Sequence, residues 1–344
     1  MKKLVAVGLG VAGMIAVGLA VYKFVGVPDV AVRESAHLSA TELSDQGLKA
    51  YYAHDLEAAI ASYTLSLKRD PNNSLTYLRR GTALQEQGQF EAASADYTQA
   101  IKLNTFGTET EAALRSMRGH TFARLGKAKE ALEDYDQSIA LNPVLPKSYR
   151  ERATLKLVTG GIGDAKPDYE AVLKIVPNDR TAQLGLGIVH YWERDWAKAA
   201  AYFALIREKS KQDAEIAMWS VLARLRNNES VKETEYQDID QNKWPGQIIA
   251  HLLGHEISLD KYIEDAAAKN DPQIADYICR GSFAAFALIQ IKQKVEKTAE
   301  EYAKISNGGS YLDSVSGLME KCGVASIERV IVQNEIKYLK AQHP

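Results

Sequence analysis

Between residues 40 and 213, apolar residues recur with the three-to-four-residue period of amphipathic helices, and no segment has the strict alternation of a strand. The pattern repeats every 34 residues once a four-residue insertion at 108–111 is allowed for. Each copy holds a small residue, a second small residue twelve positions later and an aromatic residue four positions after that. The copies place these residues at Gly47, Ala59 and Tyr63; Gly81, Ala93 and Tyr97; Gly119, Ala131 and Tyr135; Ala153, Ala165 and Tyr169; and Gly187, Ala199 and Phe203. The sequence therefore predicts an all-α fold with five helical hairpins over 40–213.

The repeated positions have simple steric roles. A small residue lets the first helix of a hairpin approach the second, and residues four apart share one face of the second helix. Pro71, Pro143 and Pro177 are placed to end that second helix, because proline cannot continue the hydrogen-bond ladder. This pattern resembles the tetratricopeptide repeat (TPR). The resemblance implies a solenoid whose first helices line a groove for peptides or helices.

Beyond residue 213 the register weakens, and we expect a C-terminal helical, TPR-like region over 214–344. Residues 213–226 read as an amphipathic helix, and the acidic stretch 227–241 reads as a solvated helix or linker. The remaining helices are expected at 244–253, 259–268, 271–291, 295–306 and 326–340.

The N-terminus carries a candidate membrane segment. Lys2 and Lys3 precede an uncharged apolar run over residues 4–22, which as a helix would span roughly 28 Å, close to the thickness of a bilayer core. We predict an uncleaved signal-anchor in 1–23 and a linker over 24–39. The positive N-terminus places the bulk of the chain outside the cytoplasm. The alternative is a signal peptide cleaved after Ala20, which would release the protein.

The order of residues in the C-terminal region is similar to that of NlpI-type TPR proteins, which are bacterial envelope proteins. It is carried by Trp219, Trp244-Pro245, Leu253-Gly254, Cys279 and Phe283. The resemblance implies a scaffold at the bacterial inner membrane, facing the periplasm, that docks cell-wall hydrolases or an envelope protease. The chain departs from the prototype, because no cysteine for a lipid anchor lies near its N-terminus. A cytoplasm-facing assembly factor is the alternative, and a homo-oligomer is compatible with either arrangement.

The family's groove positions on the first helices give the candidate protein-binding residues. They are Tyr51, Tyr52, Gln85, His120, Lys147, Arg150, Tyr191 and Trp192. The aromatic members suit anchoring, although they could equally pack against the next repeat. Cytosolic co-chaperone repeats grip a terminal carboxylate with paired lysines and asparagines, but here Ser44 and Leu48 occupy the first two of those positions.

Composition adds little chemistry. A net charge of −2 argues against a dedicated nucleic-acid binder, and no motif points to a cofactor. We therefore expect a non-catalytic protein. The rival is a metal-dependent enzyme using His251 and His255, which stand four residues apart, with Glu256. Cys279 and Cys322 are either a disulfide or two separate thiols.

Arginines recur at one position of three repeats, as Arg80, Arg118 and Arg152. They form either a ladder for anions or a set of periodic ion pairs at the surface or between repeats. We favour ion pairs, with acids such as Glu57 and Glu91 as partners.

Overall fold

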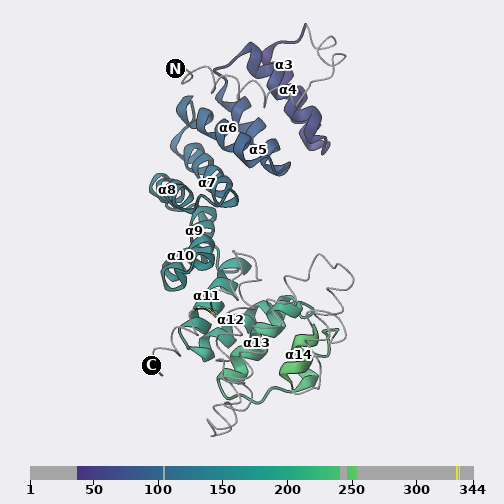
Figure 1. Cartoon of the computed structure of the whole chain (residues 1–344), viewed down its shortest axis with the longest axis vertical. Helices are drawn as coiled ribbons and strands as arrows, with labels where there is room; N and C mark the ends of the chain where they lie inside the picture. Colours follow the sequence, from purple (N-terminus) through teal and green to yellow (C-terminus); the bar gives the residue numbers. More distant parts are fainter. Residues whose placement is uncertain (1–36, 104, 241–245, 254–330, 332, 334–344) are drawn as a thin grey trace, which may run out of the picture. The chain divides into compact units, whose positions relative to one another are not determined.

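The computed structural model describes residues 37–103, 105–240, 246–253, 331 and 333. Every element in these residues is helical, as the sequence predicts (Figure 1). The five predicted hairpins are α3 (Ala40–Tyr52) with α4 (Leu56–Arg69), α5 (Ser74–Glu86) with α6 (Phe90–Leu103), α7 (Thr108–Arg124) with α8 (Ala128–Leu141), α9 (Pro146–Val158) with α10 (Ile162–Ile175), and α11 (Arg180–Trp192) with α12 (Trp196–Lys209).

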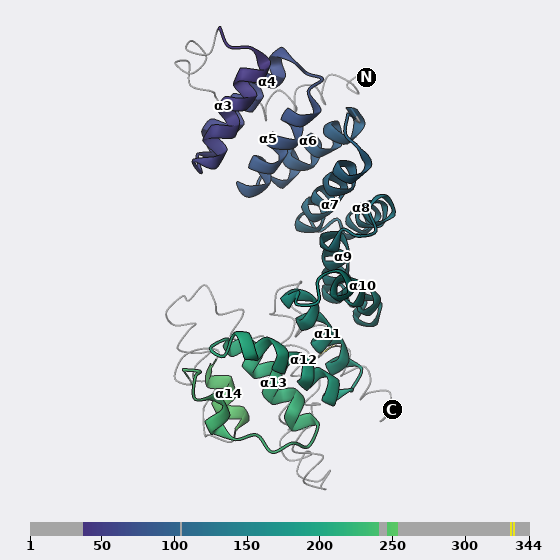
Figure 2. The same cartoon turned by 180° about the vertical axis from the view of Figure 1, so that it is seen from behind.

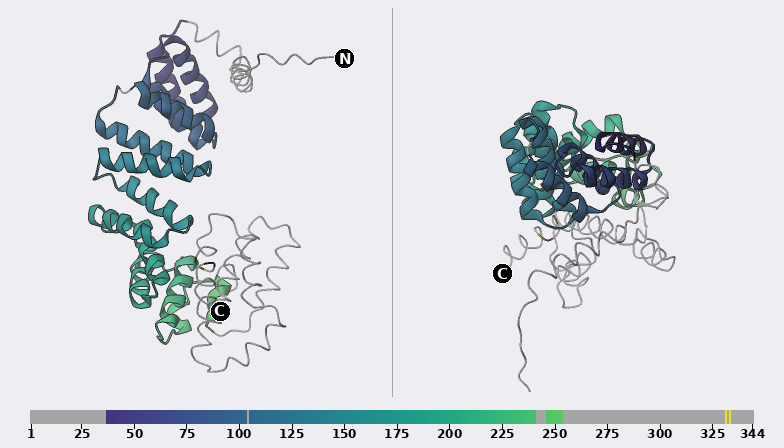
Figure 3. Two further views of the ribbon diagram at one scale, coloured as in Figure 1. Left: turned by 60° about the vertical axis from the view of Figure 1, so that its left-hand side comes forward. Right: turned by 90° about the horizontal axis from the view of Figure 1, so that it is seen from above.

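The chain divides into two compact units, Met1–Pro143 and Val144–Pro344. The described helices α3–α8 belong to the first unit, and α9–α14 belong to the second. Within each unit the helices pack in chain order, so that a second helix contacts both its own first helix and the first helix of the next hairpin (Figure 2). Figure 3 shows the same pairing of neighbouring helices from two further directions.

Helix ends follow local chemistry. Helices α4, α8 and α10 each end two residues before a proline, at Arg69, Leu141 and Ile175. The residue between, which must avoid the helical region ahead of proline, has a φ of −130°, −141° and −130° in the three cases. The prediction that Pro71, Pro143 and Pro177 stop these helices is confirmed.

The repeated small and aromatic residues form the core of each hairpin. Tyr63, Tyr97, Tyr135, Tyr169 and Phe203 are all buried. The small residue on the first helix lies directly over the ring: a Cβ on Gly47 would lie 2.6 Å from Cε1 of Tyr63, and one on Gly187 would lie 2.5 Å from Cε1 of Phe203. Only glycine permits so close an approach at these positions.

The described part continues past the fifth hairpin. α13 (Ala214–Arg226) matches the helix predicted at 213–226, and α14 (Gly246–Leu252) lies within the one predicted at 244–253. Between them, η1 (Glu233–Tyr236) is a single 3₁₀ turn, so this stretch follows the linker alternative rather than the solvated helix. Tyr236 is 1% exposed, and its hydroxyl lies 3.2 Å from Oγ of Ser220, so the acidic stretch also contributes an aromatic residue to the core.

None of the described helices is long and apolar enough to cross a membrane. The predicted anchor at 4–22 lies outside the described residues, as do Cys279, Cys322 and the four helices expected between 259 and 340 apart from residues 331 and 333. Those expectations stay predictions.

Candidate protein-binding face

The candidate residues of the first unit lie on the first helices of its hairpins. We use the term first-helix face for seven residues on the first helices of this unit: Leu48, Tyr51, Leu78, Thr82, Gln85, His120 and Ala123. All seven are half-buried, so each leaves part of its side chain accessible. Ser44 and Ser116, at equivalent first-helix positions, are buried. The face combines four apolar or aromatic side chains with three polar ones.

Tyr51 and Tyr52 end helix α3 and form a pair of rings. Their centroids lie 5.8 Å apart at an interplanar angle of 67°. The Tyr51 hydroxyl donates a hydrogen bond to Oε1 of Glu86, at the end of α5. Partial burial and the neighbouring Glu86 carboxylate raise the pKa of Tyr51 to about 12, so its hydroxyl keeps the proton that it donates. Tyr52 is 74% exposed.

Two polar groups on and beneath this face, Gln85 and Ser44, are engaged within the protein itself. The side-chain oxygen of Gln85 accepts hydrogen bonds from the Tyr97 hydroxyl at 3.1 Å and from Oγ1 of Thr121 at 3.2 Å. The Oγ of Ser44 accepts from Oγ1 of Thr76 at 3.0 Å and from Nη1 of Arg79 at 2.9 Å. Gln85 and Ser44 therefore join successive first helices.

The candidates of the second unit differ in accessibility. Tyr191 is only 3% exposed, and its ring packs edge-on against Trp196 and Trp219, at centroid distances of 4.9 and 5.4 Å. Tyr191 therefore packs against neighbouring helices, as the alternative interpretation of the aromatic candidates expected, and its ring is not accessible to a ligand. Trp192 is 38% exposed and remains available, and Lys147 is half-buried.

Arg150 serves a structural contact. Its Nη1 lies 2.6 Å from Oδ2 of Asp179, while Oδ1 of the same carboxylate caps α11 by accepting from the backbone N–H of Ala182 at 2.9 Å. Arg180 makes the equivalent ion pair with Asp213, the N-cap of α13. These carboxylates each combine a helix cap with an ion pair to the preceding first helix.

The recurring arginines are ion-paired, as predicted, but the expected partners were wrong. Each binds a carboxylate sixteen residues later, on the second helix of its own hairpin: Arg80 pairs with Asp96, Arg118 with Asp134 and Arg152 with Asp168. In the first two pairs both nitrogen–oxygen contacts are 2.7–2.8 Å. The carboxylates are buried and lie immediately before the core tyrosine, whereas Glu57 and Glu91 are exposed.

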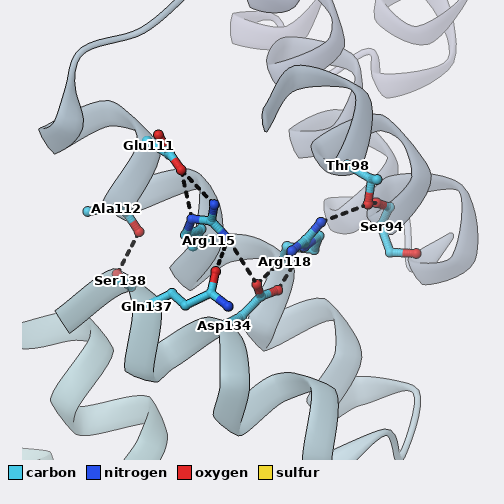
Figure 4. Close-up of polar contacts among 9 residues, drawn as sticks. All are labelled: Ser94, Thr98, Glu111, Ala112, Arg115, Arg118, Asp134, Gln137 and Ser138. Atoms are coloured by element: carbon cyan, nitrogen blue, oxygen red, sulfur yellow. Dashed lines mark hydrogen bonds and ion pairs between the residues drawn. The ribbon is translucent and has the colours of Figure 1, made fainter. Parts of the chain in front are cut away.

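Arg118 and Arg80 also reach the preceding hairpin, and Figure 4 shows the contact of Arg118 with Thr98. Nη1 of Arg118 donates to Oγ1 of Thr98 at 3.1 Å, and Nη1 of Arg80 donates to Oγ1 of Thr64 at 3.1 Å. One guanidinium therefore ties three helices together: its own, the second helix of its hairpin and the second helix of the hairpin before.

The described residues contain no group of three or more His, Cys, Asp and Glu side chains arranged for a metal ion. His251 belongs to α14, while its predicted partners His255 and Glu256 lie outside the described residues. The metal-site alternative therefore stays untested.

Comparison with known proteins identifies the repeat. The family model for the tetratricopeptide repeat matches residues 78–146 and 150–214. This chain contains tetratricopeptide repeats. A solved TPR protein from Parabacteroides merdae has the same fold, with a TM-score of 0.50 and 16% identity, and the match covers 82% of this chain and 98% of that one.

Curated relatives also share sequence with these repeats. The chain is 24% identical over 280 residues to DnaJ homolog subfamily C member 3 of Bos taurus, across 78% of this chain and 49% of the relative. Its Mus musculus counterpart is 33% identical over 97 residues, which cover 28% of this chain and 18% of the relative. The chain spans about half the length or less of these relatives. The repeats make it a protein suited to protein–protein interaction.

Proposed function

We propose that this protein is a non-catalytic scaffold that docks segments of other proteins on the first helices of its repeats. The observation that carries the proposal is the first-helix face of the first unit. Its seven residues are neither core nor fully solvated, and several are apolar. Half-buried apolar and aromatic side chains on adjacent helices give a partner contact area at little entropic cost.

We further propose that the scaffold is tethered to the bacterial inner membrane through residues 4–22 and faces the periplasm. Lys2 and Lys3 before the apolar run support this orientation. The similarity to NlpI-type proteins supports cell-wall hydrolases or an envelope protease as the docked partners. A reporter enzyme that is active only in the periplasm, fused at the C-terminus, tests the topology. We expect this reporter to be active. An inactive periplasmic reporter together with an active cytoplasmic reporter would show the opposite orientation.

Affinity capture after in-cell crosslinking tests the docking itself. Leu48→Glu places a charge on the half-buried first-helix face, whereas Gln99→Glu adds the same charge at an exposed position of second helix α6. Mass spectrometry is expected to recover envelope enzymes with the wild type and Gln99→Glu, and to lose them with Leu48→Glu. Unchanged recovery with Leu48→Glu, in protein that keeps its helical circular dichroism, would contradict docking on this face.

A further inference from the structure

The end of helix α3 combines two aromatic rings with an uncompensated carboxylate. Tyr52 is 74% exposed, and its ring lies edge-on to Tyr51. Tyr51 is half-buried and fixed by its hydrogen bond to Glu86. The hydrogen bond holds one carboxylate oxygen beside the aromatic pair and leaves the other free to accept.

The charge of Glu86 has no partner in the part of the chain that the structure describes. Glu86 is exposed, and none of the ion pairs among described residues involves it. Tyrosine faces attract cations, and a carboxylate at the same place adds a directional acceptor.

We propose that Tyr51, Tyr52 and Glu86 form a receptor for a lysine or arginine side chain of the docked segment. This inference rests on the proposed function, because it specifies the chemistry of the segment that the first-helix face takes. The stem of the basic side chain lies along the Tyr52 ring, and its ammonium or guanidinium group donates to the free oxygen of Glu86.

The neighbouring polar groups favour a basic over an acidic ligand. Arg79, the arginine of α5 nearest to α3, is already engaged by Oγ of Ser44 at 2.9 Å and Oδ1 of Asp45 at 3.4 Å. Lys49, one turn before Tyr52 on α3, is exposed, so its ammonium group could attract an acidic segment to the same place. Lys49 is therefore the informative control.

The test is a titration of the full-length chain, extracted in detergent, with two fluorescein-labelled probes. One is a 15-residue peptide of alternating lysine and serine, and the other carries glutamate in place of lysine. Fluorescence anisotropy is expected to show binding of the lysine peptide alone, weakening as salt is raised. Glu86→Gln, whose amide oxygen still accepts from Tyr51, should raise the Kd about tenfold, since it removes one charge-assisted hydrogen bond.

Three further variants sharpen the result. Tyr52→Leu keeps apolar area but removes the π face, so the Kd should rise about threefold. Lys49→Gln should not weaken binding, and neither should Glu133→Gln at an exposed position of α8. Equal binding of both peptides, or an unchanged Kd in Glu86→Gln and Tyr52→Leu, would overturn the receptor. If that occurs while Leu48→Glu still abolishes capture of partners, the docking function stands and only its basic specificity fails.

Discussion

Arg80 and Asp96 are the most buried of the three arginine–aspartate pairs, with side chains 10% and 6% exposed. Burial raises the pKa of the Asp96 carboxyl, although the Arg80 guanidinium acts to lower it. Such a pair specifies how the helices meet more than it adds stability.

Asp96→Ala should therefore lower the free energy of unfolding by about 3–5 kcal/mol, because it leaves the Arg80 guanidinium buried without its carboxylate. The double change Arg80→Leu with Asp96→Leu should cost far less, since both charges go together. Urea unfolding of the two variants measures the difference. A double variant as unstable as the single one would show that the pair is a net source of stability.

His190 gives the second unit a pH dependence. It is 5% exposed at the end of α11, stacked on Tyr202, with Nδ1 3.2 Å from Oε2 of Glu193. Burial, followed by the positive charge of Lys166, lowers its pKa below the ordinary 6.5, against the opposing effect of Glu193.

Because the unfolded chain then binds the proton more readily, stability is full above pH 6.5 and falls as the pH drops from 6.5 toward the lowered pKa. His190→Gln should flatten this part of the stability profile, measured by urea unfolding between pH 5 and 7.5. An identical slope in wild type and variant would assign the pH dependence to other groups.

At the scale of elements, side-chain caps begin the first helices α3, α5 and α11, whereas α7 and α9 have none. Asp179 accepts from the N–H of Ala182 and also binds Arg150. Asp179→Ala should cost about 0.5–2 kcal/mol for the cap, with more for the lost ion pair. Asp179→Asn keeps a capping oxygen and loses only the charge, so it should cost less. Equal losses in the two variants would mean that the cap contributes nothing.

At Gly187 the two helices of the hairpin lie too close together to accept a larger side chain. Gly187→Val would place Cβ about where the Phe203 ring lies, 2.5 Å from its Cε1. Overpacking of this kind costs about 1–3 kcal/mol or more. Adding Phe203→Ala should relieve part of the clash, so the double variant should be more stable than the sum of single effects predicts. Strict additivity would place the strain elsewhere.

The hairpins were predictable because their signals are local. The prolines and the four-residue spacing from the second small residue to the aromatic each act within one helix or turn, and the 34-residue period repeats them. The partners of Arg80, Arg118 and Arg152 could not be predicted in the same way. Each partner lies across the turn, sixteen residues later, and next to a core tyrosine, where burial disfavours a charged side chain.

The exception in the first hairpin is explained by the same contacts. In the first hairpin Gln46 and Ser62 replace the arginine and aspartate. The arginine at this position reaches back to a threonine of the preceding hairpin, and no hairpin precedes α3 in the described part of the chain. Tyr236 was likewise missed, because a buried aromatic in a 3₁₀ turn carries no helical periodicity.

At the scale of the whole molecule, the described helices fall into two units of three and two hairpins, with α13 and α14 following in the second. Of the residues predicted to bind partners, Tyr51 and Tyr52 remain accessible, whereas Tyr191 belongs to the core. The sequence could place all of them on first helices but could not separate core from surface. That distinction depends on what the following helix covers.

The central claim is that partners dock on the first helices. Site-specific photocrosslinking in living cells tests it most directly, with a photoreactive residue at Leu48 or Leu78 on that face and at exposed Glu133 of second helix α8 as the control. Adducts with the same envelope proteins from both first-helix positions, and none from Glu133, are the predicted result. Equal adducts from Glu133, or none from either first-helix position while partners are still captured, would contradict the account.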